Sequence, residues 1–134
     1  MTELLQTWCK QVWEQGDLEA IDRLLSSDTQ ADGIIAGEAM GPDDFKILVI
    51  ALRELMGSLT VTLRKIIDQD DWIAAFFSVS AQPDSTAEPI ATSGMVFARF
   101  DGKKMIKTCN CVDFINFFNH TPLTAKSERF DVRW

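Results

Sequence analysis

Residues 8–25, with the sequence WCKQVWEQGDLEAIDRLL, decide the fold because one amphipathic helix ends within this stretch and a second one begins. Gly16 can adopt the left-handed conformation that closes a helix, and the carboxylate of Asp17 can cap the next one. Apolar residues recur at helical spacing on both sides of the junction: Leu4, Leu5, Trp8, Cys9, Val12 and Trp13 before it, and Leu18, Ile21, Leu24 and Leu25 after it. We therefore predict two helices that each bury one apolar stripe.

A third helix is predicted between Pro42 and Gly57, and a short strand is expected before it over residues 32–36. Proline suits the first helical position, and the carboxylates of Asp43 and Asp44 favour the positive end of the helix dipole. The apolar residues that follow keep the helical period and define the expected buried face: Phe45, Leu48, Val49, Leu52, Leu55 and Met56.

After this helix the apolar period changes to two, which predicts strands. Residues 59–67 alternate until Ile66 and Ile67 break the phase, as a bulge or a strand end would. Residues 72–81 are apolar in both phases, so we expect a strand that is covered on both faces.

Residues 90–100 and 103–113 are predicted to pair as a hairpin around Asp101-Gly102. The element order is then helix, helix, short strand, helix and four antiparallel strands. This order predicts an α+β fold in which three N-terminal helices pack in a strongly curved, mostly antiparallel sheet and leave a hollow between the layers. The length of 134 residues favours a single domain over residues 1–134.

The charge balance argues against nucleic acids and anionic membrane surfaces as partners. Twenty acidic side chains against thirteen basic ones leave a formal charge of −7, which repels phosphate groups. No run approaches the roughly 20 apolar residues of a membrane-spanning helix, and the start, Met1-Thr2-Glu3, lacks the basic character of a secretory signal. We expect a soluble, cytoplasmic protein.

The three cysteines, Cys9, Cys109 and Cys111, are predicted to be free thiols because their number is odd and no secretory signal precedes them. Cys109 and Cys111 share one face of a strand, which could suit a metal. The chain contains only one histidine, however, so a four-ligand zinc site is hard to assemble. We interpret the cysteines as small buried hydrophobic residues and predict neither a metal nor a cofactor.

Four short motifs, in their order along the chain, resemble those of the SnoaL-like polyketide cyclases, which belong to the nuclear transport factor 2-like and ketosteroid isomerase superfamily. The motifs are VWEQGDLEAI at 12–21, GPDDF at 41–45, DGKK at 101–104 and VDF at 112–114. The resemblance covers residues 3–118 and implies a cone-shaped fold, often dimeric, with an apolar pocket. It does not by itself imply cyclase activity, because the fold hosts enzymes, binding modules and transport factors.

In the cyclase branch, the resemblance implies a Tyr, a His and an Asp in the pocket, and these positions fall on Cys9, Asp32 and Asn110. A thiol cannot replace a phenol as a strong hydrogen-bond donor to an enolate. Asp32 can act as a base, although Asp32-Gly33 is also a common turn composition. Asn110 cannot exchange a proton at neutral pH, but its amide can donate a hydrogen bond to a carbonyl. Asp32 and Asn110 are therefore the candidate catalytic residues.

Strand alternation places Asn110 on the same face as Thr108 and opposite Asp113, and we predict that the Asn110 face points into the hollow. Methionine and aromatic side chains form adaptable apolar walls, with plain core packing as the alternative role. The candidate ligand-binding residues are Cys9, Trp13, Trp72, Phe76, Met95, Phe97 and Thr108.

The C-terminal tail, residues 120–134, ends in a run that alternates apolar and polar residues up to Trp134. Tryptophan is rarely left in solvent at a free terminus. We predict that the tail docks, as an added edge strand of its own sheet or of a partner subunit's sheet.

Three functions follow as hypotheses. The first is a homodimeric protein that binds a small apolar carbonyl compound without cyclase-type catalysis. The second is an isomerase or cyclase that acts on a carbon acid with Asp32 as base and Asn110 as oxyanion donor. The third is a non-catalytic dimeric interaction module.

Overall fold

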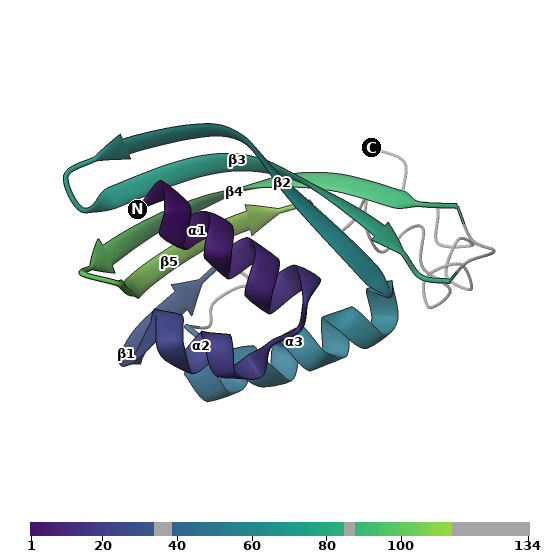
Figure 1. Ribbon diagram of the computed structural model, residues 1–134, viewed down its shortest axis with the longest axis horizontal. Coiled ribbons are helices and arrows are strands. Elements are labelled where there is room, and N and C mark those ends of the chain that lie inside the picture. The colour runs from purple at the N-terminus through teal and green to yellow at the C-terminus, as the bar shows by residue number, and fades with distance from the viewer. Residues whose placement is uncertain (34–38, 85–87, 114–134) are drawn as a thin grey trace.

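The computed structural model describes residues 1–33, 39–84 and 88–113 (Figure 1). The chain opens with helix α1 (Thr2–Trp8), which continues into a π-helix, η1 (Cys9–Glu14), and is followed by helix α2 (Leu18–Leu24). The predicted junction between the two helices is confirmed. Gly16 has a φ of +68°, and the Asp17 carboxylate caps α2 by accepting a hydrogen bond of 3.1 Å from the backbone N–H of Glu19.

Helix α3 (Pro42–Met56) begins at the predicted proline and ends before Gly57, whose φ of +73° lies in the left-handed region. Its buried residues are Phe45, Val49 and Met56, while Leu48, Leu52 and Leu55 are half-buried. The predicted apolar face of this helix therefore turns toward the rest of the molecule.

The sheet has five strands in the order β1-β5-β4-β3-β2. The strands are β1 (Leu25–Asp32), β2 (Ser58–Gln69), β3 (Trp72–Gln82), β4 (Ile90–Asp101) and β5 (Lys104–Val112). The four long strands pair antiparallel, and β1 pairs parallel to β5. The predicted short strand over 32–36 was placed too late, because β1 begins directly after α2 and ends at Asp32; residues 34–38 lie outside the described chain.

Two bulges interrupt the antiparallel ladders. The register of β2 against β3 shifts between Leu63 and Lys65, slightly before the predicted break at Ile66. A second shift, in the pairing of β4 with β5, leaves Ile106 as an extra residue on β5. Because of this second bulge, every residue of β5 after Ile106 pairs with a β4 residue one position further along than in an uninterrupted ladder.

The helices cover one face of the curved sheet, and they lie on its concave side (Figure 1). Strand β3 reflects this arrangement, because Ile73, Ala75 and Ala81 are buried against the helices while Phe76 is 44% exposed on the opposite face. The prediction that β3 is covered on both faces is therefore wrong for the described residues. The concave face and the helices share a main core and a smaller second cluster around Met56. The most deeply buried side chains of the main core include Leu5, Val12, Ile21, Val49, Ile73 and Met105.

The α+β architecture with three helices inside a curved, mostly antiparallel sheet is confirmed. Among the described helices, none has the length and apolar character needed to cross a membrane. The predicted docking of the C-terminal tail falls on residues outside the described ranges.

Candidate functional site

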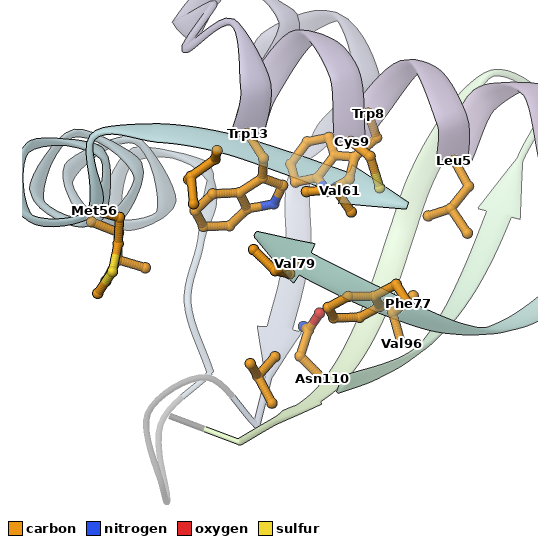
Figure 2. Close-up of a pocket in the computed structure, with 13 residues that line it drawn as sticks. Leu5, Trp8, Cys9, Trp13, Met56, Val61, Phe77, Val79, Val96 and Asn110 are labelled. Atoms are coloured by element: carbon orange, nitrogen blue, oxygen red, sulfur yellow. The ribbon is translucent and has the colours of Figure 1, made fainter. Parts of the chain in front are cut away.

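A pocket with a volume of about 100 Å³ lies between the first helical segment, α3 and the concave face of the sheet (Figure 2). Almost every side chain around it is apolar, and the residues come from seven elements. The lining consists of Leu5, Trp8, Cys9, Trp13, Leu52, Met56, Leu59, Val61, Phe77, Val79, Val96, Asn110 and Val112.

The π-helix η1 supplies the aromatic wall of this pocket. Trp13 packs edge-on against Phe45, with the ring centroids 5.6 Å apart, and Arg53 of α3 donates hydrogen bonds to the backbone carbonyls of Trp13 and Glu14 at 2.5 and 2.8 Å. The Glu14 carboxylate accepts a hydrogen bond of 3.1 Å from the backbone N–H of Val61 on β2. Helix α3 and the edge strand β2 therefore both hold η1 in place.

Cys9 is the one ionisable side chain among the lining residues of the described chain. Burial, reinforced by the negative charge of Glu14, raises the pKa of this thiol to about 12. At neutral pH Cys9 is therefore a protonated thiol, which is neither a base nor an activated nucleophile.

Asn110 is the polar residue of the lining, and its amide orientation is set by its neighbours. The Nδ2 group donates hydrogen bonds to the backbone carbonyl of Asp32 at 3.2 Å and to the Oγ1 atom of Thr108 at 2.6 Å. A carbonyl oxygen can only accept a hydrogen bond, so the NH₂ side of the amide must face Asp32. The Oδ1 atom is left without a hydrogen bond to any described residue, and Figure 2 shows it on the side of Phe77.

Asp32 and Thr108 meet Asn110 but do not line the pocket. Asp32 contributes its backbone carbonyl to the amide of Asn110, and its carboxylate is not part of the lining. Thr108 is only 4% exposed and lies under Asn110, where its hydroxyl oxygen accepts from the amide. The structure thus brings the two candidate catalytic residues together through the side chain of Asn110 and the backbone of Asp32, and the Asp32 carboxylate takes no part in this contact.

Four of the predicted wall residues lie on the opposite, convex face of the sheet. Phe76, Met95 and Phe97 are 44, 57 and 46% exposed, and Trp72 stacks on Phe97 with the ring centroids 4.5 Å apart. The expectation that these four residues line the pocket is wrong. The pocket is lined instead by residues that alternate with them on β3 and β4 and point to the concave face: Phe77, Val79 and Val96.

The bulge at Ile106 explains this difference. The hairpin begins with Asp101 opposite Lys104, and an uninterrupted ladder would place Met95 opposite Asn110 on the concave face. Because β5 has one extra residue, Asn110 pairs with Val96, and Met95 pairs with Cys111 on the convex face. A one-residue bulge leaves no mark in the sequence of strands whose two faces are both apolar. The sequence therefore did not predict which of their residues line the pocket.

Cys109 and Cys111 also lie on the convex face, as partners of Phe97 and Met95. Both are free thiols, and Cys111 is exposed. The interpretation of Cys111 as a buried hydrophobic residue is therefore wrong, whereas Cys9 is buried as expected. Within the described ranges, no three His, Cys, Asp or Glu side chains come together as a group able to hold a metal ion.

Comparison with solved structures places this architecture among known folds. A candidate polyketide cyclase from Acidithiobacillus ferrooxidans superposes with a TM-score of 0.72 at 19% identity, over 87% of this chain and 90% of that one. A candidate SnoaL-like polyketide cyclase from Jannaschia sp. CCS1 gives a TM-score of 0.76 at 10% identity, with 89% of each chain covered.

A third similar structure is a hypothetical protein with a ketosteroid isomerase-like fold from Catenulispora acidiphila, in complex with trimethylamine. It gives a TM-score of 0.69 at 16% identity, over 81% of this chain and 83% of that one. At these identities the likeness concerns the fold alone. No curated protein matches the chain. The SnoaL-like domain family, in contrast, matches residues 5–108, well over half of the sequence, and the chain therefore belongs to that family.

Proposed function

We propose that this protein binds a small, largely apolar molecule in the pocket and does so without proton-transfer chemistry. The observation that carries this proposal is the composition of the wall, where the ionisable group is a single thiol that stays protonated at neutral pH. An apolar concavity with one oriented polar residue is typical of a small-molecule site. The volume of about 100 Å³ is below the roughly 150 Å³ of an engineered cavity that binds benzene, so the pocket takes a molecule of one ring at most.

The alternative function, an isomerase or cyclase, lacks support from the described residues. Proton abstraction next to a carbonyl needs a base within hydrogen-bond reach of the substrate and donors aimed at the developing oxyanion. The carboxylate of Asp32 does not line the pocket, and the amide donors of Asn110 are both engaged. The similarity to candidate cyclases supports the fold and leaves the reaction open.

Calorimetric titration with p-xylene tests the proposal, because this probe is a single apolar ring without hydrogen-bonding groups. We expect saturable binding to the unaltered protein and its loss in Val79→Phe, which fills the pocket from β3. The matched control is Ser80→Phe, which places the same side chain at an exposed position next along the strand and should leave binding unchanged. Absence of p-xylene binding, or equal binding by both variants, would contradict the proposal.

The convex face favours a second proposal, in which two copies of the chain associate. Apolar side chains gather there around the stacked pair Trp72 and Phe97, and Met95 and Phe76 beside them are about half exposed. Exposed apolar patches of this kind commonly mark interaction sites. A two-fold axis would let the same patch meet itself, as in most soluble homodimers. We therefore infer a homodimer that is formed through this face.

A further inference from the structure

We propose that the pocket selects ligands that present a hydrogen-bond donor, such as a small alcohol or phenol, over the corresponding carbonyl compounds. This inference rests on the proposed binding function and specifies its ligand class. It reverses the expectation of a carbonyl ligand, which depended on Asn110 acting as a donor toward the pocket.

The side-chain amide of Asn110 is held in one of its two flipped orientations. In the opposite orientation Oδ1 would face the carbonyl oxygen of Asp32, 3.2 Å from the present Nδ2 position, and two acceptors would repel each other. Thr108 accepts a short hydrogen bond of 2.6 Å from the same NH₂ group. The Asp32 carbonyl therefore fixes the orientation of the amide, and the Thr108 hydroxyl accepts from the same NH₂ group, so both N–H groups are already engaged.

The side-chain oxygen of Asn110 is the part of the amide that is left for a ligand. Oδ1 of Asn110 has no hydrogen-bond partner among the described residues, and it belongs to a residue of the pocket wall. Among the described residues no buried side-chain oxygen lacks a hydrogen bond, so this acceptor is still open to the pocket beside its apolar partner Val96 on β4. A bound ligand would cover it, and leaving it unpaired there is costly. A ligand hydroxyl can donate to this oxygen, whereas a ligand carbonyl cannot and would leave Asn110 unpaired.

The indole N–H of Trp13, on η1 across the pocket, is a second polar group of the wall. Figure 2 shows its indole nitrogen on the edge of the ring that faces the other lining residues. This N–H makes no hydrogen bond to a described residue, and it is not a buried group. The indole N–H can only donate. A hydroxyl group is able both to donate to Asn110 and to accept from an N–H, so it is compatible with both polar groups of the wall. A carbonyl oxygen is compatible with Trp13 alone.

Three probes of nearly the same shape test this selectivity by calorimetry: p-cresol with a hydroxyl, p-tolualdehyde with a carbonyl and p-xylene with neither. We expect p-cresol to bind the unaltered protein about fivefold more tightly than either of the other two, since one net hydrogen bond is worth roughly 0.5–1.5 kcal/mol. Asn110→Ala should bring the p-cresol affinity to that of p-xylene. The matched control is Val112→Ala, the next inward residue of β5, which should change the affinity for all three probes by a similar factor.

The outcomes separate this inference from the proposed function. If none of the three probes binds, both proposals fail. If all three bind with equal affinity, or if p-tolualdehyde binds most tightly, the pocket is a binding site but the donor preference is overturned. Persistence of the p-cresol preference in folded Asn110→Ala would also overturn it. The comparison of probes on the unaltered protein requires no variant, so it decides the question even if a substitution at Asn110 prevents folding.

Discussion

The Nδ2 atom of Asn110 lies 3.2 Å from the backbone carbonyl oxygen of Asp32, and this contact joins the ends of two strands that are 78 residues apart in sequence. Asp32 ends β1 and Asn110 lies near the end of β5, so the hydrogen bond fastens the parallel edge of the sheet beside the pocket. It also uses one of the two amide donors that an oxyanion site would need, and the hydrogen bond to Thr108 uses the other. The role of Asp32 in this contact is that of a backbone acceptor, independent of its carboxylate.

The first prediction follows from this role. Asp32→Ala keeps the backbone carbonyl and removes only the carboxylate, so we expect its affinity for p-xylene and p-cresol to stay within about twofold of the unaltered protein. Calorimetric titration of both probes measures this. A tenfold loss of affinity in a folded variant would show that the carboxylate takes part in binding.

The second prediction concerns alkaline pH. The thiol of Cys9 has a pKa of about 12 in the folded protein against 9.0 for an unperturbed thiol. Between these two pH values the unfolded chain therefore binds fewer protons than the folded one. The free energy of unfolding must then fall as pH rises above 9, by up to about 1.4 kcal/mol per pH unit from this group. Cys9→Ala should flatten that decline.

Urea unfolding at pH 8, 9 and 10 under reducing conditions measures this difference. The comparison depends on the slopes rather than on the absolute stability, which the substitution lowers by removing a buried side chain. The chain contains no tyrosine, so phenol ionisation does not contribute in this range. Equal slopes for the two proteins would mean that the Cys9 thiol is not the source of the alkaline instability.

The third prediction concerns the junction between η1 and α2. Gly16→Ala should lower the free energy of unfolding by about 2 kcal/mol, because a non-glycine residue at a left-handed φ costs roughly 1–2 kcal/mol and the new methyl group would collide with the side chain of Arg53. Gly41→Ala is the control, since a methyl group there meets no atom within 4 Å. Thermal and urea unfolding of both variants give the comparison, and equal losses would refute the role of the junction.

The fourth prediction concerns the convex face. We expect the protein to elute as a dimer in size-exclusion chromatography with light scattering, and Met95→Glu to yield monomers because it places a charge inside the apolar patch. Thr60→Glu, at an exposed position on β2, should leave the dimer intact. A monomeric unaltered protein, or an unchanged dimer in Met95→Glu, would contradict association through this face.

Much of the fold is predictable from local chemistry. The ends of the helices are marked by residues with special backbone or capping properties: Gly16 and Asp17 at the first junction, and Pro42 and Gly57 at the two ends of α3. The structure confirms these positions. The π-helical winding of residues 9–14 was not predicted, because the apolar spacing of the segment also fits an α-helix.

The site was harder to predict than the fold. Phe76 and Phe77 are adjacent and chemically identical, and only the position of the helices decides that the first lies outside and the second lines the pocket. The single extra residue at Ile106 then determines that Asn110 lies beside Val96 rather than Met95. Both outcomes depend on long-range packing and on a bulge, neither of which changes the hydrophobic pattern of the strands.

Arg53 does not line the pocket, yet it joins the wall that bears Trp13 to the C-terminal part of α3 through two carbonyl groups. Its aliphatic and guanidinium atoms also occupy the space beside Gly16. The position of the Trp13 wall is consequently tied to α3, a helix whose opposite surface, including Ile47 and Ile50, is exposed to solvent. Substitutions on that outer surface of α3 therefore offer a way to alter the shape of the pocket without changing any side chain that lines it.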